Sequence, residues 1–568
     1  METLPLELLE PLLLCLDPID RVDKALICHR WAECMVGSLL LDNVPLRLCG
    51  STLLADFPSL MESRRQYSHL HLTRVSLYAL PPEFWMKFAG NLLSLRLIDC
   101  CFSNQALSFV LGQCTRLEFL EITRPRLSSK LGHKPYGRGP PPISSAFRFK
   151  EAADSDIGSE EVRRVLLNLR DLSLHIDFED CLGLAMASRL LELTPNLDFL
   201  HLPCRAFRVV PYIIANQKRL TKLNLRAFSS EEPGLEELLK RMSGTLKELC
   251  LTNCGSVVPR TFNSVNQCVH LQKLTLIQPT ELSDSQIGDL LAKSPQLTFV
   301  QLVLEVDLSD EILTPISNLK HLRHLELVNS KSLENCIYLQ SLESTRIRCA
   351  PRVLETITEL QDLRTLMLVN FDITSAFLDK IIENLPLLEH LQINCQRLAD
   401  EEGVKIRQLQ HLRSLSLLGA LFFHDETFSK GLGSPVMEKL ELEGSRLTDR
   451  GFRSIVAHHG HLRKLKLVNC PNISLSGLLT ALSRETNLHE LVLSARFADH
   501  NEKPWFLRSL TDTCPRLRVL HLLPLPYREE AEFQMLYRRT SAACFTHYSE
   551  PNMSELDRSY FNDLSFCP

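Results

Sequence analysis

The apolar residues of this chain recur with a fixed period, and the stretch 271–302 contains one full copy of it. An L-x-x-L-x-L segment begins at Leu271 and returns at Leu297, 26 residues later. Leu274 and Leu276 lie two positions apart, so on a short strand both side chains point to the same face. One such unit cannot bury its own apolar face. The period therefore predicts a stack of repeated units.

The segment between the two copies has the pattern of a helix. Ser283 and Gln286 form a predicted capping box, and Ile287 and Leu290 follow at helical spacing. A period of 20–29 residues with this signature is typical of leucine-rich repeats. Strands stack about 4.8 Å apart, whereas helices need about 8–10 Å, so such a stack must curve. We expect an α/β solenoid: a curved parallel sheet with helices on the convex face.

Seventeen such segments can be found in the chain. Their first apolar positions are Leu72, Leu92, Leu117, Leu169, Leu197, Leu220, Leu246, Leu271, Leu297, Leu322, Leu363, Leu388, Leu412, Met437, Leu462, Leu488 and Leu517. The step from Leu322 to Leu363 is long, and a degenerate unit near Leu339 and Leu342 would give eighteen repeats.

Three regions depart from the period. Residues 1–45 read as a small helical domain, and the repeats occupy 46–523. Within them, 124–161 is rich in Pro, Gly and Ser and is expected to be a flexible insertion, with a short helix from about Glu160. It is either a regulatory or partner-binding loop or an unselected surface insertion. Residues 524–568 form a predicted cap and tail, in which 527–539 could be one helix covering the last strand.

Composition and charge exclude several classes of protein. With a formal charge of −5, the chain lacks the basic patch of a nucleic-acid-binding protein. No apolar run is long enough to span a membrane. The N-terminus is acidic and lacks a signal-peptide cleavage pattern, so we expect a cytosolic or nuclear protein with reduced thiols.

The 19 cysteines are expected to be core thiols, because many occupy repeated positions. Cys114, Cys268 and Cys514 precede a first leucine by three residues, and Cys100, Cys254 and Cys470 follow one by eight. No paired C-x-x-C modules with zinc spacing appear.

No catalytic motif, phosphate-binding loop or metal site is found, and no cofactor is expected. Histidines recur just before the first leucine of a repeat, which indicates a structural role and not a catalytic one. They are His270, His321, His411 and His461. The pair His458-His459 lies at a predicted helix end, where a capping role is favoured over a metal site.

Function must then come from the shape of the solenoid. The side chains two and four positions after each first leucine should line the concave face, and their mixed chemistry suits a polypeptide ligand. The substrate-binding candidates are Phe299, Gln301, His324, Glu326, Lys439, Glu441, Lys464 and Lys466. Phe119, Phe199 and Phe299 recur at the first of these positions, either as binding anchors or as side chains that cover one another.

The N-terminal segment LPLELLEPLLLCLDPIDRVDKALICHRWAECM resembles the F-box motif. The resemblance rests on Leu4-Pro5, Glu7-Leu8-Leu9, Leu16-Asp17-Pro18, Asp20, Ala25-Leu26, Cys28 and Arg30-Trp31. With its repeats, the whole chain resembles the F-box proteins with leucine-rich repeats.

That resemblance implies a non-catalytic substrate receptor of a ubiquitin ligase. The F-box would dock on a Skp-family adaptor, which joins it to a cullin scaffold and a RING subunit, while the repeats would hold a protein substrate. The implied adaptor-binding residues are Leu4, Pro5, Leu8, Leu9, Leu16, Ile19 and Trp31. The alternative is a repeat scaffold or inhibitor in which residues 1–45 only cap the solenoid.

Overall fold

The structure of the protein is a computed structural model. It describes residues 13, 41, 44–50, 53–127, 157, 159–176, 181–202, 206–226, 234–252, 263–277, 282–304, 309–329, 356–369, 371, 373–429, 434–483, 487–494, 509–510, 512–514, 517, 519–523, 534–540 and 543–549. The chain forms two compact units, the first comprising 1–271 and 279–282 and the second 272–278 and 283–568.

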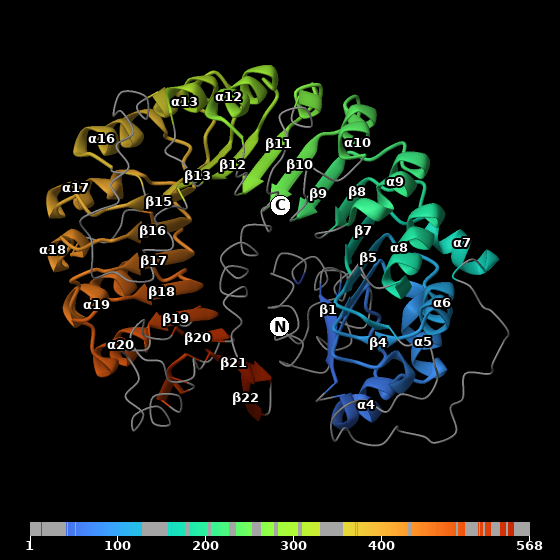
Figure 1. Ribbon diagram of the computed structural model, residues 1–568. Helices are drawn as coiled ribbons and strands as arrows, with labels where there is room; N and C mark the ends of the chain where they lie inside the picture. The colour runs from blue at the N-terminus through green and yellow to red at the C-terminus, as the bar shows by residue number, and fades with distance from the viewer. Residues whose placement is uncertain are drawn as a thin grey trace. The chain divides into compact units, whose positions relative to one another are not determined.

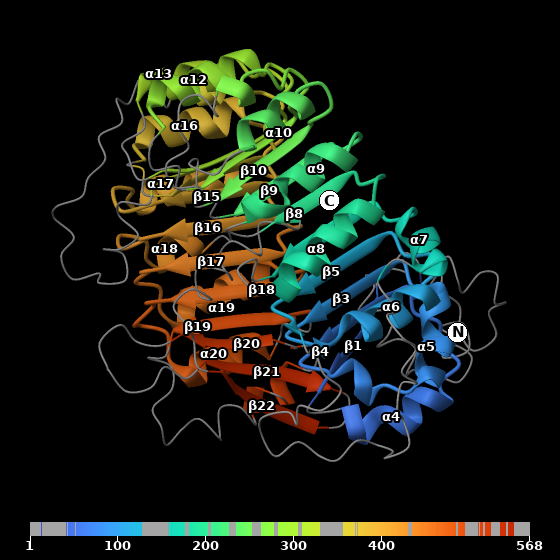
Figure 2. The same ribbon diagram turned by 45° about the vertical axis from the view of Figure 1, so that its right-hand side comes forward.

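In the described part of the first unit, eight strands form a parallel sheet, each in register with the next. They are β1 (Pro45–Cys49), β2 (His69–Thr73), β3 (Ser94–Ile98), β5 (Phe119–Thr123), β7 (Asp171–His175), β8 (Phe199–Leu202), β9 (Lys222–Arg226) and β10 (Glu248–Thr252). The helices are α4 (Leu53–Glu62), α5 (Pro82–Phe88), α6 (Asn104–Gln113), α7 (Glu160–Leu166), α8 (Cys181–Leu193), α9 (Val210–Asn216) and α10 (Leu235–Met242). A two-stranded ladder joins β4 (Cys101–Phe102) to β6 (Arg126–Leu127). Figure 2 shows α8 and α9 lying along the outer side of this sheet.

The described part of the second unit has ten parallel strands, again paired in chain order. They are β11 (Lys273–Ile277), β12 (Phe299–Leu304), β13 (His324–Asn329), β14 (Thr365–Val369), β15 (His390–Asn394), β16 (Ser414–Leu418), β17 (Lys439–Glu443), β18 (Lys464–Val468), β19 (Glu490–Ser494) and β20 (Val519–Leu523). The helices are α12 (Asp284–Lys293), α13 (Asp310–Ser317), α16 (Ser375–Asn384), α17 (Asp400–Lys405), α18 (Asp425–Phe428), α19 (Asp449–His458) and α20 (Leu475–Leu482). The sheet curves with its helices on the convex side (Figure 1), which confirms the predicted leucine-rich-repeat solenoid.

The repeated apolar positions build the core. In the unit that begins at Leu271, Leu274 and Leu276 are fully buried, while Lys273 and Thr275 on the other face stay partly accessible. Burying one such leucine contributes about 1.5–3 kcal/mol, and an equivalent buried apolar pair recurs in each strand of the parallel sheets from β2 to β19. The cysteines follow the same rule, because each described one of the repeated positions is at most 2% exposed: Cys100, Cys114, Cys268, Cys470 and Cys514. Cys254 lies outside the described residues.

Two predicted helix starts are confirmed. Ser283 and Gln286 form a reciprocal capping box at the start of α12. Helix α7 begins at Glu160, where the sequence predicts it.

The predicted repeat positions are wrong at the N-terminal end of the sheet. Strand β2 is His69–Thr73, so Leu72 is the third apolar position of its repeat and Tyr67 takes the place of the first leucine. The error arises because Leu72, Val75 and Leu77 imitate the repeat signature, although Val75 and Leu77 are buried in the turn that follows the strand. Strand β1, which precedes it, lacks a first leucine altogether.

Two further expectations are corrected. The degenerate unit near Leu339 and Leu342 lies outside the described residues, but β13 pairs directly with β14, so no strand lies between them. The segment expected to be helical at 527–539 instead contains the strand β21 (Gln534–Thr540), antiparallel to β20 and to β22 (Ala543–Ser549). Most of the 124–161 insertion is also outside the described residues, and β5 pairs directly with β7 across it.

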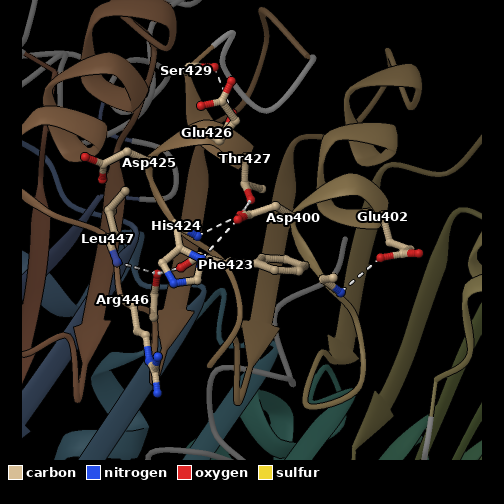
Figure 3. A network of polar contacts seen from close by, with 12 residues as sticks. Asp400, Glu402, Phe423, His424, Asp425, Glu426, Thr427, Ser429, Arg446 and Leu447 are labelled. Atoms are coloured by element: carbon tan, nitrogen blue, oxygen red, sulfur yellow. Dashed lines mark hydrogen bonds and ion pairs between the residues drawn. The ribbon is translucent and has the colours of Figure 1, made fainter.

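Three consecutive helices of the second unit begin with an aspartate that bonds to the next repeat, and we call this set the aspartate ladder. The aspartates are Asp400, Asp425 and Asp449, and their partners, the N-cap residues of the following helices, are His424, Thr448 and Ser474. One carboxylate oxygen accepts the partner's backbone N–H at 2.8, 2.8 and 2.7 Å, and the other bonds to its side chain at 3.0, 2.6 and 2.6 Å. Figure 3 shows the first rung.

The ladder needs space at the third residue of the receiving helix. At Gly477 an added Cβ would lie 2.0 Å from the Cγ of Asp449, and at Gly451 it would lie 2.4 Å from the Oδ1 of Asp425. Thr427 occupies this place in the first rung, where its hydroxyl donates to Asp400 (Figure 3). Glycine therefore makes room for the carboxylate of the preceding repeat.

Candidate protein-binding face

The eight substrate-binding candidates all lie on the strand-borne face of the second unit. Their partners across the sheet are in register, with Phe299 opposite His324 and Gln301 opposite Glu326. The other four form a second group, in which Lys439 lies opposite Lys464 and Glu441 opposite Lys466. Strands β14, β15 and β16 separate the two groups. At about 4.8 Å per strand, the four steps from β13 to β17 amount to about 19 Å.

The first group, which we call the aromatic–acid cluster, consists of Phe299, Gln301, His324 and Glu326. The rings of Phe299 and His324 are stacked, with centroids 4.1 Å apart and planes inclined by 9°. The side-chain amide of Gln301 donates to Oε2 of Glu326 at 3.0 Å, and Nε2 of His324 lies 3.8 Å from the same oxygen. Glu326 is only 3% exposed although it points away from the leucine core.

The expected mutual covering of phenylalanines does not occur. Phe119 and Phe199 lie on β5 and β8, with Asp171 of β7 in register between them. Phe119 instead lies beneath the guanidinium of Arg96, at 5.1 Å from the ring centroid, and Phe299 stacks on a histidine.

The second group, which we call the lysine–glutamate cluster, consists of Lys439, Glu441, Lys464 and Lys466. Lys466 forms an ion pair with the buried Glu441, and Lys464 pairs with Glu490 at 3.1 Å. Within the described residues, Lys439 forms no ion pair.

Glu443 continues the outward row of β17, next to this cluster. Burial raises the pKa of its carboxyl, although Lys466 acts in the opposite direction.

Between the two clusters, the outward positions of β14, β15 and β16 hold no carboxylate, lysine or arginine. Thr365, Gln392 and Ser416 are at most 6% exposed, and burial lowers the pKa of His390 and so favours its neutral form. In the outward rows, charge is thus concentrated in the two clusters. A separate row of ion pairs, which joins Arg364, Glu389, Arg413 and Glu438, lies one residue before strands β14 to β17.

Sequence reasoning missed a third outward row, six positions after the first leucine. Five of its members form an aliphatic cluster in which each is at most 8% exposed: Ile277, Val303, Val328, Val369 and Leu418. The same position holds Asn394 in β15 and Glu443 in β17. The recurrence of branched aliphatic residues at this offset was the available signal, because strand alternation places the sixth position on the same face as the second and fourth.

The described residues offer no metal site. Among them, no group of three or more His, Cys, Asp or Glu side chains is placed to hold a metal ion. His459 is 2% exposed and its Nδ1 bonds to the carbonyl of Ser434 at 3.1 Å, as expected for a structural histidine. None of the described helices combines the length and the apolar character needed to cross a bilayer.

The adaptor-binding candidates of the N-terminal segment lie outside the described residues. They are Leu4, Pro5, Leu8, Leu9, Leu16, Ile19 and Trp31.

Comparison with known proteins gives the following. No protein-family model matches the chain. The Rad7–Elc1 complex of yeast is similar at 16% identity and a TM-score of 0.41, covering 59% of this chain and 82% of that one. The leucine-rich repeat-containing protein LegL7 of Legionella pneumophila is similar at 15% identity and a TM-score of 0.27, covering 56% of this chain and 87% of that one. At such values neither similarity carries a functional argument.

Proposed function

We propose that this protein is the substrate-recognition subunit of a Skp–cullin–F-box ubiquitin ligase. The observation that carries the proposal is the F-box resemblance of residues 4–31, joined in one chain to a leucine-rich-repeat solenoid. The solenoid supports it with a polar, aromatic-bearing strand face, which suits the capture of a protein. In this proposal the chain catalyses nothing. It brings the substrate to a bound E2 by tethering, which raises the effective concentration of the substrate lysine.

In the proposed assembly Leu4, Leu8 and Trp31 are among the residues that dock on the adaptor. Burial of several leucines and a tryptophan, at about 1.5–3 kcal/mol each, offsets the cost of association. A cytosolic or nuclear location follows, because that is where such ligases would meet their partners.

The test is recovery of partners from cell extract by the full chain, by a chain lacking residues 1–43, and by a Trp31→Ala chain. The truncation stops short of β1, which begins at Pro45, so the sheet keeps its first strand. Met86→Ala is the matched control, because Met86 is 64% exposed on the first unit. We expect the Skp-family adaptor and a cullin with the full chain and with Met86→Ala only.

A second candidate function is a repeat scaffold or inhibitor, with residues 1–45 as a cap. It is favoured if neither the full chain nor Met86→Ala recovers adaptor or cullin. Proteins retained by both the full and the truncated chain are ligands of the solenoid in either case.

A further inference from the structure

The aromatic–acid cluster contains a carboxylate whose charge is not balanced. Glu326 is 3% exposed, and its polar neighbours are the neutral amide of Gln301 and the imidazole of His324. Within the described residues, no lysine or arginine forms an ion pair with it. Burying a carboxylate is costly unless a cation or several hydrogen bonds compensate it. A cation placed beside Glu326 would therefore stabilise this cluster.

The same cluster has the shape that a basic side chain prefers. The stacked rings of Phe299 and His324 lie one outward position before Glu326, and both side chains are partly accessible. A guanidinium stacks on aromatic faces and pairs with a carboxylate through two parallel hydrogen bonds. Arginine fits such a ring-and-carboxylate arrangement better than lysine does.

The lysine–glutamate cluster, in contrast, would be stabilised by an added anion. Lys439 and Lys464 lie directly opposite each other on neighbouring strands, an arrangement that is destabilising for like charges. Glu490 balances Lys464, and Glu441 balances Lys466. Lys439 is left without an ion pair among the described residues, so its ammonium is the group in this cluster that a ligand carboxylate could pair with.

We propose that this face binds an extended polypeptide segment that places a basic side chain, preferably arginine, on Glu326 and an acidic side chain on Lys439. The separation of about 19 Å, at about 3.3 Å per extended residue, sets the two charges about six residues apart. This proposal rests on the proposed function only in that the ligand of the solenoid is a protein.

The test measures binding of fluorescein-labelled synthetic dodecapeptides to the full chain by fluorescence polarisation. One peptide carries Arg and Glu six positions apart in a Gly/Ser background. The others have citrulline in place of Arg, Gln in place of Glu, or the two charges only two positions apart. We expect the first peptide to bind about tenfold more tightly than the citrulline peptide, the usual loss when a hydrogen bond to a charged group is removed.

Two substitutions assign the effect to the clusters. Glu326→Gln keeps the size of the side chain and should abolish the preference for Arg over citrulline, and Lys439→Gln should abolish a preference for Glu over Gln. Glu401→Gln and Lys293→Gln are the matched controls, because both residues are exposed on helices. Circular dichroism confirms that each variant is folded.

The proposal is overturned if wild-type chain binds the Arg and citrulline peptides equally, binds none of the peptides, or keeps its preference after Glu326→Gln. Each of these outcomes leaves recovery of adaptor and cullin unaffected. Failure of the ligase assignment would appear in that recovery and not in the peptide measurements.

Discussion

The aspartate ladder predicts that Gly477→Ala destabilises the wild-type protein but stabilises a chain that already carries Asp449→Ala. Gly477→Ala places a Cβ within 2.0–2.3 Å of the three carboxylate atoms of Asp449, and no other residue supplies its nearest contacts. The carboxylate must move, and its hydrogen bonds to the N–H and hydroxyl of Ser474 are lost. In an Asp449→Ala chain these three nearest atoms are absent.

The magnitudes follow from these two bonds. Each joins a neutral donor to a charged acceptor, but both are solvent-accessible, so we take about 1 kcal/mol apiece, at the low end for such bonds. Asp449→Ala should therefore cost about 2 kcal/mol of unfolding free energy. Gly477→Ala loses the same bonds but gains about 0.5–1 kcal/mol from the helix preference of alanine, for a net cost of about 1–1.5 kcal/mol. In the Asp449→Ala background it should stabilise by about 0.5–1 kcal/mol.

The assay is urea unfolding of the four chains of the double-mutant cycle, followed by circular dichroism. Hydrogen exchange of the Ser474 amide, read by mass spectrometry, gives a local measure that does not depend on two-state unfolding of the whole solenoid. Gly460→Ala is the control, since no atom lies within 4 Å of its added Cβ. If Gly477→Ala were equally destabilising with and without Asp449, the contact between the two repeats would not be the cause.

Three further predictions concern burial and packing. Burial raises the pKa of Cys114 and of Cys470 to about 12, whereas Cys181 is exposed. Iodoacetamide at pH 8 should therefore label Cys181 in the folded protein, and Cys114 and Cys470 only after unfolding. Labelling of Cys470 in the folded protein, detected by peptide mass spectrometry, would contradict this. Burial, with His175 and Arg226 acting in the same direction, lowers the pKa of His201 from 6.5 to about 3. The folded state therefore keeps this imidazole neutral, so its contribution to the free energy of unfolding is complete above pH 6.5 and is lost as the pH falls below that value. In urea unfolding measured at several pH values, His201→Asn should make the free energy of unfolding fall less steeply towards acid pH. Gly288→Ala places a Cβ 2.2 Å from the carbonyl oxygen of Glu311, a backbone atom that cannot rotate away, and should cost about 1–3 kcal/mol, whereas Gly244→Ala, with no neighbour within 4 Å, should leave the melting temperature nearly unchanged.

The fold could be predicted from the sequence wherever a leucine begins the repeat. The first apolar position fixes the strand that follows it, and sixteen of the seventeen positions are correct. Prediction failed at β1 and β2, where Asn43 and Tyr67 stand in the place of that leucine. It failed again at Gln534–Thr540, because a segment outside the repeat has no period that separates helix from strand.

For the candidate face, the sequence predicted which side chains point outward within each repeat, but not the contacts between neighbouring repeats. Strand alternation placed Phe299 and Glu326 outward, but it could not show that Phe299 stacks on His324, since that contact depends on the register of two neighbouring repeats. The ladder was missed for the same reason. Asp449 reads as an ordinary first-turn residue of its own helix, and its partner Ser474 lies in the next repeat.

The antiparallel strand that follows β20 has a consequence for association between molecules. In a stack of parallel repeats, the last strand has unpaired backbone N–H and C=O groups along its outer edge. A strand of a second molecule could pair with them and extend the sheet. Strand β21 runs in the opposite direction and pairs with β20 between Leu520 and Tyr537. The edge that would template another repeat is thereby taken by a strand that cannot propagate the parallel order. We expect a chain ending at residue 523 to expose that edge and to associate end to end, which size-exclusion chromatography would detect.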